Sequence, residues 1–95
     1  MIILPMKDAQ TITVLKALAD PTRLKLVRSL ASCPDSVKSC GDLSAVADLS
    51  QPAMSHHFTK LAAAGVVLES KEGTHKIYRL NDKLLSSIGI DIKKL

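Results

Sequence analysis

Two adjacent histidines are the first residues whose chemistry raises a question. His56 and His57 lie in the stretch LSQPAMSHHF, within a segment of helical pattern. An imidazole ring can bind a metal ion, transfer a proton or form a hydrogen bond with a partner. Neighbouring residues point about 100° apart around a helix, whereas zinc ligands on one helix lie about three or four residues apart. The pair is therefore a poor metal site, and we predict no metal ligand here.

Two cysteines form a second candidate site. Cys33 and Cys40 are separated by PDSVKS, a polar segment long enough to bring the two Cα atoms within the roughly 4.4–6.8 Å that a disulfide requires. If Ser39 caps a helix, Cys40 is its first residue and lies beside Lys38, and both the helix dipole and the lysine lower the pKa of a thiol. We predict a redox or electrophile switch at Cys33 and Cys40, with inert thiols and a thiolate metal site as alternatives.

Composition limits the kinds of function. A chain of 95 residues makes one domain, 1–95, and its net charge of +4 favours a polyanionic partner, although an ordinary basic surface would look the same. Phe58 and Tyr78 are the only aromatic residues. Proteins that bind single-stranded nucleic acid stack its bases on aromatic side chains, so such a partner is disfavoured. No Ser-His-Asp spacing, phosphate loop or enclosed carboxylate pair is present, so we do not expect an enzyme or a cofactor.

The start of the chain shows no targeting signal. MIILPMKD lacks the basic region and cleavage site of a signal peptide, and no run approaches the roughly 18 apolar residues that cross a bilayer. We therefore expect a cytoplasmic protein that does not enter a membrane.

Apolar periodicity predicts two helices at the start. The first runs from Asp8 to Ala19. Its apolar stripe consists of Ile12, Leu15, Leu18 and Ala19. Asp20 is a predicted N-cap and Pro21 fits the first position of the second helix. The apolar face of that helix consists of Leu24, Val27, Leu30 and Ala31. Ser32 to Lys38 reads as a loop.

Two more helices are expected before residue 66. Ser39 and Asp42 resemble a capping box for a short third helix through Ala47. After a turn at residues 48–49, Ser50 is the predicted cap of a fourth helix that ends at Gly65.

The remaining chain changes character. Val66 to Ser70 and His75 to Leu80 are rich in β-branched and aromatic residues and flank KEGT, which predicts a β-hairpin. A fifth helix follows, capped by Asn81 or Asp82. The predicted fold is mainly α with a β-hairpin wing, in the order ααααββα. This order is typical of a winged helix-turn-helix, with the helix-turn-helix at 40–65 and the wing at 66–80.

The fourth helix has two faces. Met54, Phe58, Leu61 and Ala62 form the side expected to pack inward. His57 lies at the border, where we expect a half-buried ring that bonds a carbonyl or simply packs. The outer side is polar and free of acidic residues, as close approach to base edges requires. The predicted DNA-contacting residues of this side are Gln51, Ser55, His56, Thr59 and Lys60.

The hairpin tip offers a second set of contacts. Lys71, Thr74, His75 and Lys76 lie close together in SKEGTHK. In a winged helix such a tip follows the DNA backbone or the minor groove, and an ordinary solvated turn is the alternative.

Three stretches carry a resemblance to a known family. LADPTRLKLVRSL, DLSAVADLSQPAMSHHFTKLAAAGVV and KEGTHKIYRL resemble successive signatures of the ArsR/SmtB bacterial transcriptional repressors, over roughly Leu15 to Asn81. The resemblance implies a homodimer that binds an inverted-repeat operator on double-stranded DNA and releases it when an effector arrives. It implies dimerisation through 8–19 and 82–95. It also implies DNA reading by Ser50, Gln51, Ser55, His56 and Thr59.

Departures from the family pattern concern the effector. Metal-sensing members often carry CVCDL at the third helix, where this chain has SCGDL, so that Ser39 and Gly41 replace the flanking cysteines. The C-terminal segment contains Asp82 and Asp91 but no histidine or glutamate. Both familiar metal sites are missing. A Cys33–Cys40 disulfide, by tilting the fourth helix, is the predicted trigger of DNA release. A nonstandard Cys/His metal site and a winged-helix module that binds protein are the alternatives.

Overall fold

The computed structural model describes residues 6–32, 37–39 and 49–95 of the chain. The predicted third helix, Cys33 and Cys40 lie outside these residues. The described helices are α1 (Met6–Leu18), α2 (Pro21–Ala31), α4 (Gln51–Ala63), α5 (Asp82–Ser87) and a final 3₁₀ turn, η2 (Ile92–Lys94). No described helix has the length and apolar content needed to cross a membrane.

Three helix starts lie where the sequence predicts them, because each has a side chain that accepts from a free backbone N–H of the first turn. Asp20 Oδ2 accepts from the Arg23 N–H at 2.9 Å before α2, and Pro21 occupies the first turn. Ser50 caps α4 and Asn81 caps α5 in the same way.

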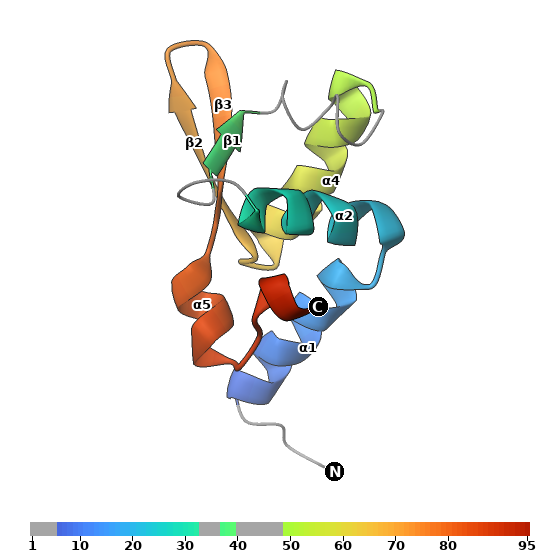
Figure 1. Cartoon of the computed structure of the whole chain (residues 1–95), viewed down its shortest axis with the longest axis vertical. Coiled ribbons are helices and arrows are strands. Elements are labelled where there is room, and N and C mark those ends of the chain that lie inside the picture. The colour runs from blue at the N-terminus through green and yellow to red at the C-terminus, as the bar shows by residue number, and fades with distance from the viewer. Residues whose placement is uncertain (1–5, 33–36, 40–48) are drawn as a thin grey trace.

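The strands form a small antiparallel sheet in the order β1-β3-β2. Its members are β1 (Val37–Ser39), β2 (Val67–Glu72) and β3 (His75–Leu80). Figure 1 shows the β2–β3 hairpin extending at one end of the molecule, with α1 and α5 toward the other end.

Two predictions that concern the sheet are wrong. Residues 32–38 were expected as a loop, but Val37 to Ser39 pairs with Arg79 to Ile77. The edge of β3 supplies the hydrogen-bonding partner that makes these residues a strand, which is a long-range effect. KEGT is not all turn either, because β2 continues through Glu72, which pairs with His75. Only Gly73 and Thr74 connect the strands, and Gly73 has a φ of 65°.

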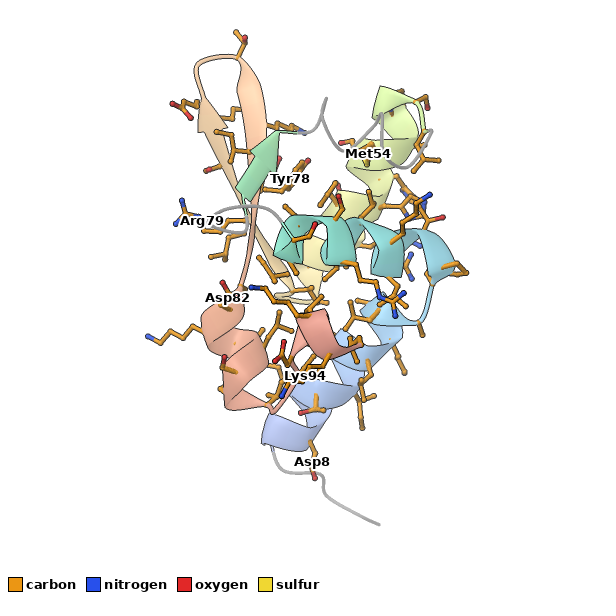
Figure 2. All side chains as sticks on the ribbon, viewed as in Figure 1. Asp8, Met54, Tyr78, Arg79, Asp82 and Lys94 are labelled. Carbon is orange, nitrogen blue, oxygen red and sulfur yellow. The ribbon has the colours of Figure 1, made fainter. Side chains whose placement is uncertain are left out.

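The core centres on a stack of the two aromatic side chains. The rings of Phe58 on α4 and Tyr78 on β3 lie 3.9 Å apart between centroids and are nearly parallel, at 11°. Both side chains are almost completely buried, and Leu26 and Leu30 of α2 belong to the same cluster. Figure 2 shows Tyr78 on the side of β3 that faces the helices. The stack joins the wing to α4.

The buried side of α1 differs from the predicted stripe. Val14, Ala17 and Leu18 are buried, whereas Ile12 and Leu15 are 40% and 51% exposed. Of the predicted stripe, Leu18 alone belongs to the core. The helix has apolar residues on two sides, and the chain's own core contacts only one of them. The second side is left at the surface.

Gly65 ends α4 as predicted. Its φ is 83°, in the left-handed region, and its N–H donates to the Ala62 carbonyl at 3.0 Å. Asn81 Nδ2 donates to the Gly65 carbonyl at 2.9 Å, which ties the end of α4 to the start of α5. The positive φ favours glycine, and a Cβ at this position would lie 2.8 Å from Leu84 Cδ2, so the end of that side chain would have to shift.

We expect Gly65→Ala to lower the free energy of unfolding by about 2–4 kcal/mol, because it adds a steric clash to the cost of positive φ. The matched control is Gly89→Ala, since Gly89 has a φ of 79° and nothing within 4 Å of an added Cβ. This control should lose only about 1–2 kcal/mol. Urea denaturation measures both values, and equal losses would contradict the role of Leu84.

Candidate nucleic-acid interface

The outer side of α4 is held at the surface by the burial of its inner side. Met54, Phe58 and Leu61 are fully buried, while Ala62 packs partly against the core. The helix begins with the Ser50 cap, whose Oγ accepts from the Ala53 N–H at 3.4 Å. Its orientation follows from these anchors, and the inner face agrees with the sequence prediction.

The predicted contact residues of α4 come together on this outer side. His56, Thr59 and Lys60 are exposed, Ser50 is exposed at the cap, and Ser55 is half-buried. Gln51 is the first residue of the helix, and α4 contains no acidic residue. The Thr59 hydroxyl donates to the Ser55 carbonyl at 2.8 Å, so it faces a partner mainly as an acceptor. The surface offers small polar groups and one cation.

His57 lies at the border of α4, half-buried as predicted, with a side chain 20% exposed. Its Nδ1 is buried and makes no hydrogen bond, so the expected bond to a carbonyl is not made through this atom. The ring faces the Asp20 carboxylate instead, with 4.0 Å between Nδ1 and Oδ2. The His56 ring lies edge-on to it, at 6.0 Å between centroids.

Asp20 is itself fixed at the corner between α1 and α2. The hydrogen bond from the Arg23 N–H, assisted by the Arg23 guanidinium and His57, outweighs burial and holds the pKa of the Asp20 carboxyl below its usual value. Arg23 Nε also donates to the Ala17 carbonyl at 2.6 Å, at the end of α1. The carboxylate therefore stays charged at neutral pH.

The wing carries both signs of charge. Lys71 and Thr74 are exposed near the turn, and His75 is the first residue of β3. Lys76 pairs with Lys71 in the register, and its Nζ lies 3.4 Å from Glu69 Oε1. The predicted cluster is thus brought together, but one of its cations is partly neutralised.

Arg79 is an exposed cation that the sequence reasoning missed. Figure 2 shows it on β3, directed away from the helices and opposite to Tyr78. The alternation of HKIYRL could have identified it, because Tyr78 and Leu80 are buried and Arg79 must face the other way.

Figure 1 places the N-terminal half of α4 and the turn of the wing at the same end of the molecule. The first predicted contacts of α4, from Gln51 to His56, therefore lie toward the same end as the turn of the wing. Among residues 6–32, 37–39 and 49–95, no group of three His, Cys, Asp or Glu side chains is arranged to hold a metal ion. Cys33 and Cys40 flank the segment that contains β1, and their geometry lies outside the described part of the chain.

These features define a winged helix-turn-helix of the DNA-binding class. A family model described as the bacterial regulatory protein, arsR family, matches residues 20–68. The chain belongs to this family, whose members are DNA-binding transcriptional regulators rather than enzymes.

Curated relatives agree with this assignment. The arsenical resistance operon repressor of Staphylococcus xylosus is 37% identical over 81 residues, which cover 80% of this chain and 70% of that protein. A putative arsenical resistance operon repressor, ArsR2 of Halobacterium salinarum, is 39% identical over 70 residues. That match covers 74% of this chain but only 58% of the relative's length.

Solved structures show the same architecture. HlyU from Vibrio cholerae aligns with a TM-score of 0.76 at 31% identity, with 90% of each chain covered. A homodimeric winged helix-turn-helix DNA-binding domain from Mycobacterium bovis aligns with a TM-score of 0.72, covering 93% of this chain and 83% of that one. At 22% identity, the latter shows the fold alone.

Proposed function

We propose that this chain is a cytoplasmic transcriptional repressor that binds an inverted-repeat operator as a homodimer. The observation that carries the proposal is the surface of α4, which is polar and free of acidic residues while its other side is anchored in the core. Relatives described as operon repressors support repression as the direction of regulation.

The chemistry of α4 suits the major groove of double-stranded DNA. Gln51 can pair with adenine, and His56 can donate to N7 or O6 of guanine. Ser50, Ser55 and Thr59 suit base edges or phosphates, and Lys60 suits a phosphate. In the wing, Lys71, Thr74, His75 and Lys76 lie where they would follow the backbone or the minor groove. The Glu69 partner makes Lys76 the weaker of the two lysines.

We expect His56→Ala to weaken operator binding by about 1–3 kcal/mol, because it removes a base contact while leaving the core intact. Fluorescence anisotropy with a duplex from the region upstream of the protein's own gene measures the change. Lys25→Ala is the control and should bind normally, because this exposed lysine lies on α2, outside α4, the wing and the proposed dimer segments. Unchanged affinity of His56→Ala and Thr59→Ala together would exclude this face as the reading surface.

The proposed dimer interface involves 8–19 and 82–95. Among the described residues, the exposed large apolar side chains are Ile12, Leu15, Leu68 and Leu95. Three of these four lie in the two proposed segments. A small chain gains stability when such a surface is buried against a second copy.

We expect Leu15→Arg to shift the protein toward the monomer and to weaken operator binding at least tenfold, because two half-sites then cease to be bound as a unit. Leu68→Arg is a matched control, since both leucines are 51% exposed and Leu68 lies in the wing. Analytical ultracentrifugation of the control should give the dimer. A dimeric Leu15→Arg protein would contradict the interface.

The proposed effector signal is oxidation of Cys33 and Cys40. A hydroperoxide would take two electrons from the two thiols, forming the disulfide and releasing water and an alcohol, or water alone from hydrogen peroxide. Cys33 directly follows Ser32, the C-cap of α2, and Cys40 directly follows β1, which is paired with β3. The bond would pull on the chain leading to α4 and tilt that helix relative to its partner copy. One solved neighbour is described as reduced HlyU.

We expect hydrogen peroxide to weaken operator binding by about 1–3 kcal/mol, the usual scale of allosteric coupling. A reductant should restore binding. Gel shifts of wild type and Cys40→Ser check this, and the variant should bind with or without peroxide. Loss of binding that persists in Cys40→Ser would contradict the thiol signal, and release by a divalent metal would favour the metal-responsive alternative.

A further inference from the structure

The buried nitrogen of His57 has no role in the contacts proposed above. Nδ1 makes no hydrogen bond and lies 4.0 Å from Asp20 Oδ2. That separation is too long for a hydrogen bond, which needs roughly 2.7–3.2 Å between the heavy atoms. A buried polar atom without a partner costs free energy, so closing this gap would be favourable. The His57 ring therefore faces the Asp20 carboxylate without forming a hydrogen bond to it.

The other half of the pair is held in place. Asp20 accepts the Arg23 N–H as the cap of α2, and Arg23 Nε is engaged on the Ala17 carbonyl. The carboxylate therefore keeps both its charge and its position at the corner between α1 and α2. A contact from α4 to this corner fixes α4 relative to the other two helices.

We propose that His57 is a positioning residue for α4: its protonated ring closes on Asp20 and holds the helix in the orientation that binds DNA. The inference rests on the proposed role of α4 in reading DNA. Operator affinity should accordingly rise as the pH falls through the range in which histidine titrates.

The protonated ring differs from the neutral ring in two ways. Both of its nitrogens carry hydrogen, so Nδ1 always donates, whereas a neutral ring donates from Nδ1 in only one tautomer. It also carries the charge that Asp20 attracts. The attraction therefore exists only in the protonated form and is lost when the ring gives up its proton.

The charges at this corner oppose one another. The Asp20 carboxylate attracts a protonated ring, whereas the Arg23 guanidinium beside that carboxylate repels one. The His56 ring lies at 6.0 Å between centroids. The carboxylate lies nearest to the buried nitrogen, and Arg23 directs its Nε to the end of α1. The attraction to Asp20 therefore sets the sign of the expected effect.

Two substitutions separate the charge from the structure. Asp20→Asn retains an oxygen that caps α2 and removes the negative charge. His57→Asn retains a nitrogen at the δ position and cannot become charged. His56→Gln removes the neighbouring imidazole ring. This variant is the starting protein for all measurements, and the other substitutions are added to it.

In the His56→Gln background, we expect the operator affinity to be at least about threefold higher at pH 6 than at pH 8. Fluorescence anisotropy at constant ionic strength measures this ratio. Asp20→Asn, His57→Asn and the double variant should each reduce this dependence to the same remainder. A pH dependence that is unchanged in His57→Asn overturns the inference.

Two further measurements distinguish positioning from a direct contact. The slope of log affinity against log salt should be the same with and without His57→Asn, because a phosphate contact would change it by about one. Without DNA, urea denaturation should show a gain in stability from pH 8 to pH 6 that both single variants lose. A slope change of about one, or a stability gain that persists in both variants, overturns the positioning role.

The measurements also distinguish a failure of the His57 inference from a failure of the proposed function. If the protein binds its operator, and the His57–Asp20 coupling appears in stability but not in affinity, the inference fails while the proposed function stands. If no variant binds duplex DNA specifically at any pH, the proposed function fails and the inference fails with it.

Discussion

The stack of Phe58 on Tyr78 is the contact on which the arrangement of the molecule depends. It joins α4 to β3 with two fully buried rings, and the chain has no other aromatic residue. Aromatic pairs in proteins add about 0.5–1.5 kcal/mol to the free energy gained from burial. Because this stack and the neighbouring buried contacts join α4 to the hairpin, the surface of α4 and the wing keep a fixed relation. A DNA-binding surface made from both elements requires such a relation.

Sequence patterns predicted the parts of this arrangement that depend on local chemistry. Asp20, Ser50 and Asn81 each cap a helix where a side-chain oxygen precedes free N–H groups, and Gly65 ends α4 where a left-handed residue is needed. The inner side of α4 followed from periodicity, because a single helix with one apolar stripe has one way to face a core. The same rule failed for α1, which has two apolar sides. Periodicity cannot say which of them the rest of the chain covers.

The features that sequence patterns missed depend on residues far apart in the chain. Val37 to Ser39 becomes a strand only because β3 offers an edge. Glu69 partly neutralises Lys76 from across the hairpin, and Asp20 faces His57 from 37 positions away. Each is a pairing between elements, and pairings of this kind have no local signature. The candidate site was therefore predictable as a set of residues on α4, but not as an electrostatic environment.

The position of β1 has a consequence for how the molecule avoids self-association through its sheet. A free strand edge is a template for another chain, and a three-stranded sheet has two such edges. β1 lies along β3, so the hairpin is covered on that side over three residues. The other edge is β2, whose side chains after Val67 are exposed and include Glu69, Lys71 and Glu72. Alternating charges along an edge disfavour strand addition, so this edge of the wing resists pairing with another chain.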